Sequence, residues 1–194
     1  MDQEENMQRQ GDKEIPKEFY SFDTGKLFSE CMICGRDLLT SGVTYMIEKS
    51  IRRYPDLDAS ETIYDYAICM PCAVEQKKAM SEESLRRIEQ YFTNGFQNGA
   101  AFIGDMTMEQ RLEKCLIYGK PIGEMSEYVL QAACVGNKLS DSLPPFVIGQ
   151  KAMNEISELL SAKTRDEIDG FIDRHFSGPP EFRELLRERK IVLI

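Results

Sequence analysis

Two cysteine pairs constrain the fold of this chain more than any other feature. Cys31 and Cys34 form the first pair and Cys69 and Cys72 the second, with two residues between the cysteines of each pair. This C-x2-C spacing lets both sulfurs of a pair bind one ion, and zinc is the metal that four thiolates hold tetrahedrally. Four thiolates leave no open coordination position. We therefore expect one structural zinc ion, with these four cysteines as its ligands.

Two other interpretations of the cysteine pairs remain open. Iron is also bound by four thiolates, as in rubredoxin-like sites. Alternatively, a pair can be a redox-active dithiol where a helix N-terminus lowers the pKa of a thiol, and Cys69-Met70-Pro71-Cys72 precedes a predicted helix. The thioredoxin-like βαβ setting of such dithiols is missing from the sequence pattern, which favours the metal.

The segments around the cysteines predict a small α+β module. Gly35 directly follows the first pair, where a tight turn toward the sulfurs requires an unusual backbone conformation. Two stretches rich in β-branched and aromatic residues, 43–48 and 62–68, predict an antiparallel hairpin. Pro71 then opens a helix that begins at the second pair.

This order of knuckle, hairpin and helix resembles the treble-clef class of four-cysteine zinc modules. The resemblance covers residues 31–80 and implies a fold, not an activity, because treble-clef proteins differ widely in function. Treble-clef nucleases carry histidines in and beside the hairpin, whereas the only histidine here is His175. A nuclease is therefore not expected.

The remainder of the chain predicts helices. Ser81 is a candidate N-cap, and Thr107 with Gln110 and Thr164 with Glu167 match the capping-box pattern. Apolar residues at helical spacing over 125–135 predict another helix, followed by a loop over 137–149 that contains Pro144-Pro145. No internal repeat is evident.

The predicted fold class is therefore α+β, with an N-terminal treble-clef-like hairpin and zinc knuckle followed by an all-helical C-terminal region. The predicted organisation has three parts. They are a flexible polar tail at 1–16, the four-cysteine zinc module at 17–80 and the helical region at 81–194.

Composition limits the partners and the compartment. The formal net charge is -9, and acidic residues outnumber basic ones across the predicted zinc module. This charge disfavours nucleic acid and anionic membranes as partners. Nucleic acid remains an alternative partner because of three basic doublets, Arg52-Arg53, Lys77-Lys78 and Arg86-Arg87. The acidic start has no secretory pattern and no apolar run is long enough to span a membrane, so we expect a cytoplasmic protein with reduced thiols.

No catalytic constellation is evident. Cys115, Cys134 and His175 all fall on predicted apolar stripes and are expected to fill the core. The leading hypothesis is a zinc-binding interaction or adaptor protein with a protein partner, not an enzyme. The alternatives are a nucleic-acid-associated regulator and an enzyme whose site lies where the two regions meet, near Pro144-Pro145.

Overall fold

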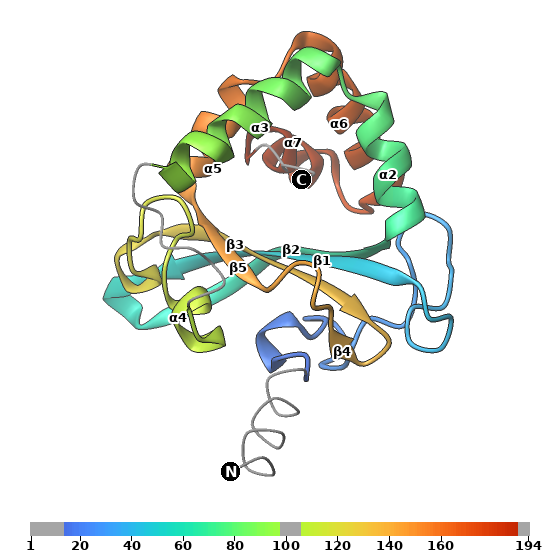
Figure 1. Cartoon of the computed structure of the whole chain (residues 1–194), viewed down its shortest axis with the longest axis horizontal. Coiled ribbons are helices and arrows are strands. Elements are labelled where there is room, and N and C mark those ends of the chain that lie inside the picture. The colour runs from blue at the N-terminus through green and yellow to red at the C-terminus, as the bar shows by residue number, and fades with distance from the viewer. Residues whose placement is uncertain (1–13, 98–105, 190–194) are drawn as a thin grey trace.

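The computed structural model describes residues 14–97 and 106–189 as layers built on one antiparallel sheet. Helices α2, α3, α5, α6 and α7 cover one face of the sheet, and the N-terminal segment and α4 cover the other (Figure 1). The strands are β1 (Thr44–Tyr54), β2 (Ala59–Cys69), β3 (Glu127–Val135), β4 (Lys138–Leu139) and β5 (Phe146–Gly149). The helices are α2 (Met70–Ala79), α3 (Glu82–Gln97), α4 (Met108–Glu113), α5 (Gln150–Glu158), α6 (Ala162–His175) and α7 (Pro180–Arg189), with short 3-10 turns η1 (Lys17–Phe19), η2 (Pro55–Leu57) and η4 (Ile122–Glu124).

The sheet joins distant parts of the chain. Its strand order is β2-β1-β3-β4, and β5 also pairs with β3. The long strand β1 pairs with β2 from Tyr45 opposite Cys69 to Tyr54 opposite Ala59, with a register shift after Ser50. It pairs with β3 from Thr44 opposite Val135 to Arg52 opposite Glu127. Strands β1 and β3 are therefore the centre of the sheet.

The predicted architecture is wrong. The strands occupy residues 44–149, with helices before and after β3 and β5, so there is no hairpin module followed by an all-helical region. The helix predicted over 125–135 is not formed: Met125 ends the turn η4, and Glu127–Val135 is strand β3. Part of the predicted loop is strand β5, which pairs with β3 through Tyr128 opposite Gly149.

The error at β3 has a physical cause. A central strand is covered on both faces, so its residues are apolar without alternation, and such a run also satisfies helical spacing. All residues of β3 from Tyr128 to Cys134 are buried. Only the partner strands β1 and β5 distinguish a helix from a strand here, because they supply the hydrogen bonds of the strand.

Several local predictions are confirmed. Strands β1 and β2 form the predicted hairpin, and α2 begins at Met70 with Pro71 in its first turn. Thr107 and Gln110 form a complete capping box at the start of α4. The predicted box at Thr164 is wrong, because α6 starts one turn earlier and is capped by Ser161, whose hydroxyl accepts from the Thr164 N–H at 3.3 Å.

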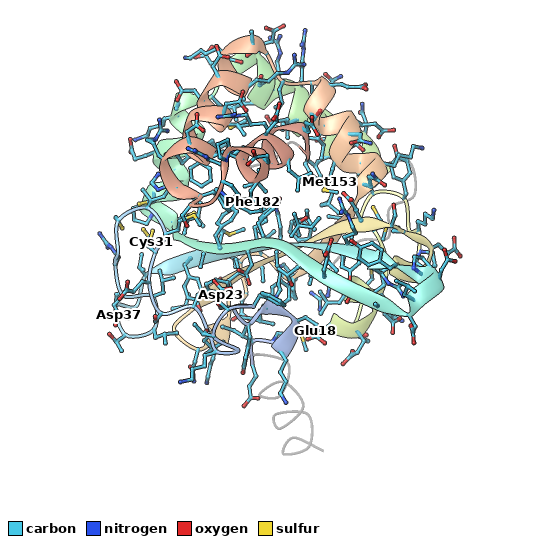
Figure 2. All side chains as sticks on the ribbon, turned by 180° about the vertical axis from the view of Figure 1, so that it is seen from behind. Glu18, Asp23, Cys31, Asp37, Met153 and Phe182 are labelled. Carbon is cyan, nitrogen blue, oxygen red and sulfur yellow. The ribbon has the colours of Figure 1, made fainter. Side chains whose placement is uncertain are left out.

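One hydrophobic core extends from Ile15 to Leu186. Tyr64 and Tyr66 of β2 pack edge-on against Phe176 on the helical side of the sheet. Phe182 and Met153 lie between the helices and the sheet in Figure 2. Of the predicted tail, residues 1–13 lie outside the described residues, whereas Ile15 is buried.

The structure contains an internal repeat that the sequence analysis missed. In each half, a hairpin runs directly into a pair of helices: β1 and β2 lead into α2 and α3, and β3 and β5 lead into α5 and α6. Glu48 and Gln131 hold the same place in their hairpins, opposite Tyr66 and Phe146. They also face each other across the β1–β3 pairing, so a local two-fold axis passes between them.

The N-termini of α3 and α6 are related by the same local two-fold axis. Ser81 and Ser161, 80 residues apart, cap α3 and α6, and their hydroxyls lie 2.8 Å from each other. The Ser81 N–H donates to the Thr164 hydroxyl at 3.0 Å, and the Ser161 N–H donates to the Ser84 hydroxyl at 2.8 Å. These reciprocal bonds join the two helix pairs, since the backbone N–H of each cap residue is satisfied by a hydroxyl of the other half.

Candidate metal centre

The first cysteine pair lies in a tight knuckle. The Gly35 N–H donates to the Cys31 carbonyl at 2.9 Å, and the Cys31 N–H donates to the Arg36 carbonyl at 2.9 Å. Gly35 has φ of 67°, a left-handed conformation that costs glycine little and other residues more. This turn brings Cys34 back toward Cys31.

The second pair lies where β2 becomes α2. Cys69 is the last residue of the strand and Cys72 lies in the first turn of the helix. The Met32 N–H donates to the Ala67 carbonyl at 2.9 Å, which attaches the knuckle to the end of β2. The Cys69 N–H then donates to the Cys31 sulfur at 3.3 Å, so the two pairs are in direct contact.

The four predicted ligands converge. The sulfurs of Cys31, Cys34, Cys69 and Cys72 all lie within 4.8 Å of one another, and those of Cys34 and Cys69 are 3.8 Å apart. A tetrahedral ion with sulfurs at about 2.3 Å has sulfur–sulfur edges of about 3.8 Å. Figure 2 shows Cys31 at the end of the sheet, with other sulfur atoms beside it. The cluster thus has the size of a four-thiolate metal site.

Burial and hydrogen bonding shift the pKa values of these thiols in opposite directions. The backbone N–H of Arg36 lowers the pKa of the exposed Cys34 thiol to about 7. Burial raises the pKa of the Cys69 thiol, and it raises the pKa of the Cys72 thiol well above its usual value. A bound cation removes this penalty because it stabilises all four thiolates.

The second half of the repeat contains a counterpart of the knuckle. The Gly119 N–H donates to the Cys115 carbonyl at 2.8 Å, and the Cys115 N–H donates to the Lys120 carbonyl at 2.8 Å. Gly119 has φ of 61°, close to that of Gly35. The sequences agree as well, Cys-Met-Ile-Cys-Gly-Arg at 31–36 and Cys-Leu-Ile-Tyr-Gly-Lys at 115–120.

The counterpart is attached to its hairpin by the same bonds. The Leu116 N–H donates to the Val147 carbonyl at 2.8 Å, and the Gly149 N–H donates to the Cys115 sulfur at 3.4 Å. Tyr118, Gly149 and Ala152 occupy the positions of Cys34, Cys69 and Cys72. One cysteine of the four remains, and this knuckle cannot form a four-thiolate site.

Other side chains fill the place of the ligands in this second knuckle. The Met125 sulfur occupies the space that a side chain at Gly149 would need. The Tyr118 hydroxyl donates to Glu155, which also accepts from Tyr91 at 2.6 Å. The Lys151 ammonium lies 3.9 Å from the centre of the Tyr118 ring. A thioether and a polar cluster thus stabilise one knuckle, whereas four sulfurs converge in the other.

The remaining candidate residues are placed as follows. Cys115 and Cys134 are buried, as expected, although they lie in an extended segment and a strand instead of helices. His175 packs against Phe171, with ring centres 5.0 Å apart, and burial lowers its pKa. The proximity of α6's C-terminus does not outweigh that burial, contrary to the effect expected from the helix dipole.

The basic doublets contribute to ion pairs. Arg52 contacts Glu127 at 2.9 Å, Lys78 contacts Glu75 at 2.7 Å and Arg87 contacts Glu83 at 2.6 Å. These carboxylates neutralise much of the charge that a phosphate backbone would require.

A buried polar pair that the sequence analysis did not single out lies on the repeat axis. The Gln131 amide donates to Glu48 at 2.8 Å, and the Tyr64 hydroxyl donates to the other oxygen of Glu48 at 2.9 Å. Burial raises the pKa of Glu48 to about 7. The available signal was one glutamate and one glutamine at matching places in two apolar stretches, Tyr45-Met46-Ile47-Glu48 and Tyr128-Val129-Leu130-Gln131.

Comparisons with known proteins add no assignment, since no protein family, curated protein or solved structure matches the chain. Within the described residues, no helix has the length and apolar character needed to cross a bilayer.

Proposed function

We propose that Cys31, Cys34, Cys69 and Cys72 hold one structural zinc ion in a protein that acts as an interaction or adaptor protein. The convergence of four sulfurs within 4.8 Å carries this proposal. Four sulfurs complete a tetrahedral shell, so the ion has no position for water or substrate. Its role is to tie the knuckle to β2 and to the first turn of α2.

The second knuckle supports this role by contrast. It keeps the same backbone bonds without the ligands, and there Met125 and the Tyr118–Glu155 contact fill the corresponding space. In the first half, the residues at the place of Met125 are Ser41-Gly42, which are too small to do this. A metal ion satisfies the same need for internal contacts at the four sulfurs.

Iron and a redox dithiol pair are less well supported than zinc. Zinc suits a site that four thiolates close to other ligands, and the four sulfurs converge on one point instead of forming two separate pairs. Metal analysis distinguishes zinc from iron directly. A redox dithiol would instead bind no metal and would cycle between thiol and disulfide.

A protein is the partner that the charge favours. The net charge of -9 and the carboxylates beside Arg52, Lys78 and Arg87 oppose binding to nucleic acid. A fluorescence anisotropy titration with duplex and single-stranded DNA and RNA at low salt tests this point. Tight, strongly salt-dependent binding would favour the nucleic-acid alternative.

The metal proposal is tested on the full chain purified without added zinc. We expect one equivalent of zinc by inductively coupled plasma mass spectrometry. Cys31→Ser should lose the metal, and Cys115→Ser, at the equivalent position of the second knuckle, should keep it. A protein without metal, or a Cys31→Ser variant that keeps metal and stability, would overturn the proposal.

The interaction role needs a separate measurement. Tagged full-length protein and its Cys31→Ser variant are isolated from the native cell, and the proteins that co-purify are quantified. We expect partners that bind the parent and are lost from the variant. Each candidate partner is then titrated as purified protein, and failure of all of them to bind would remove the adaptor role while leaving the metal site intact.

A further inference from the structure

A cleft lies between helix α2 and the sheet, beside the repeat axis. Its volume is about 300 Å³, and its walls are mostly apolar, with Met46 and Ile68 from the sheet and Ala73 and Val74 from α2. This volume lies at the lower end of the range of small-molecule sites, which are typically apolar with a few polar groups. Figure 1 shows α2 above the β1–β2 side of the sheet.

Two polar side chains lie at the sheet side of the cleft. Glu48 and Gln131 both line it, and both are buried, with 5% and 3% of their surface exposed. The Gln131 amide nitrogen is used by Glu48, which leaves the Gln131 Oε1 atom without a hydrogen-bond partner among the described residues. A buried acceptor without a donor costs about 1–3 kcal/mol, so a ligand that supplies a donor gains affinity.

The buried carboxyl group of Glu48 favours a ligand whose hydrogen-bond donor is positively charged. Glu48 accepts from the neutral groups of Tyr64 and Gln131 and forms no ion pair within residues 14–97 and 106–189. Its raised pKa of about 7 reflects this burial without a cation. A cationic nitrogen beside Glu48 would stabilise the carboxylate and could donate to Gln131 Oε1 as well.

The mouth of the cleft is open to solvent on α2. Val74 is 42% exposed and Lys77 lies on the exposed side of the same helix. Lys77 is exposed, so water weakens the interaction of its ammonium with a ligand in the cleft, whereas Glu48 is buried. The cleft thus has Val74 and Lys77 at its entrance and acceptors at its inner end.

We propose that this cleft binds a small molecule with an apolar body and a primary amine, whose N–H groups donate to Gln131 Oε1 and Glu48. The apolar part contacts Met46, Ile68 and Val74. The inference does not depend on which metal the cysteines hold.

The chemistry is tested with three probes of similar size. They are 2-phenylethylamine, which carries the cationic donor, 2-phenylethanol, which carries a neutral donor, and propylbenzene, which carries none. Isothermal titration calorimetry on the full chain at pH 8 should show the amine binding at least tenfold more tightly than the hydrocarbon, with the alcohol between them. Equal affinities, or no binding of the amine at 1 mM, would overturn the proposal.

Variants locate the site. Gln131→Met and Glu48→Gln should each weaken the amine at least fivefold and leave propylbenzene within twofold. Val74→Trp fills the cleft and should weaken all probes, whereas Glu75→Trp, on the outward side of the same helix, should not. Full amine affinity in Val74→Trp would exclude the cleft even if the two strand variants failed to fold.

Discussion

The two knuckles share their backbone and differ in what holds them together. In both, a cysteine carbonyl accepts from a left-handed glycine, and its sulfur accepts from a backbone N–H at the end of a strand, Cys69 in one case and Gly149 in the other. Only the first has four converging sulfurs. The second has Met125, Tyr118 and Glu155 in their place.

This difference shows that the contacts that form the turn are distinct from those that stabilise it against the rest of the fold. Local hydrogen bonds and a glycine with positive φ are sufficient to define the turn, because both knuckles have them. These local features do not attach the knuckle to the helix that follows its hairpin. Each half uses a different set of side-chain contacts for that attachment. We therefore expect the first half to depend on metal and the second half on side-chain packing.

Metal removal should have the largest effect. We expect chelation to cost on the order of 5 kcal/mol, less than the roughly 10–16 kcal/mol for zinc-finger peptides because the common core remains. Hydrogen exchange followed by mass spectrometry should show loss of protection in the knuckle at 31–36 and in α2, with α5 retaining it. Equal loss in α2 and α5 would contradict the division between the halves.

Met125→Ala should have the next largest effect. Met125 is buried beside Gly149, so its truncation leaves a cavity and should cost about 2–4 kcal/mol of the free energy of unfolding. Met32→Ala, at a half-buried position of the first knuckle, is the matched control and should cost less. Urea denaturation of the metal-loaded proteins measures both. If Met125→Ala reduced metal content, the two halves would not be separable in this way.

Glu48→Gln should alter the pH dependence of stability. Burial raises the pKa of Glu48 from 4.5 to about 7, so the folded protein holds a proton that the unfolded chain releases between these values. The free energy of unfolding therefore falls as pH rises from about 4.5 through 7. The variant lacks this loss, so its free energy of unfolding should exceed that of the parent by about 3 kcal/mol at pH 8, with little difference at pH 4.

Denaturant melts from pH 4 to 9 measure this effect. Glu61→Gln, at an exposed position of β2, is the control and should leave the pH profile unchanged. A parent protein whose stability rises with pH between 5 and 8, with no change in Glu48→Gln, would show that Glu48 stays ionised in the fold.

The two caps on the repeat axis should have the smallest effect. Ser81→Ala and Ser161→Ala should each cost about 1 kcal/mol, the usual value for a lost N-cap. Each hydroxyl caps its own helix and the two hydroxyls lie 2.8 Å apart, so both variants remove the same contact and the double variant should cost less than the sum. Additive losses in thermal melts would mean that the two helix pairs are not coupled at the axis.

Much of the candidate site was predictable because it depends on neighbours in sequence. The C-x2-C spacing, the turn at Gly35 and the helix entered at Pro71 each involve residues within a few positions. The counterpart at 115–120 was readable in the same way, as a knuckle with one cysteine left. Tyr118 stands where the first knuckle has its second cysteine, so this segment lacks the C-x2-C spacing that marks a metal site.

The fold class was not predictable from local pattern. The stretch at 127–135 satisfies helical spacing and is a strand, since β1 and β5 lie on its two sides. Thr164 resembles an N-cap and is instead the donor that Ser161 satisfies. For β3, the pairing with β1 about 80 positions earlier decides between two locally acceptable structures. For α6, the cap is Ser161, three residues before Thr164, and the Thr164 hydroxyl accepts instead from the distant Ser81 N–H.

The sequence by itself determined the two cysteine pairs, the β1–β2 hairpin and most helix starts, because these depend on spacing, turn residues and caps within one short segment. The tertiary structure decided that 127–135 is a central strand, that Glu48 faces Gln131 on a local axis and that Cys115 lies in a knuckle without the other three cysteines. The first two features depend on pairings between residues about 80 positions apart, such as Glu48 and Gln131, and the third depends on the contact between Cys115 and Gly149, 34 positions apart. Such pairings form only when the whole sheet assembles, since their backbone groups have no local alternative of equal stability.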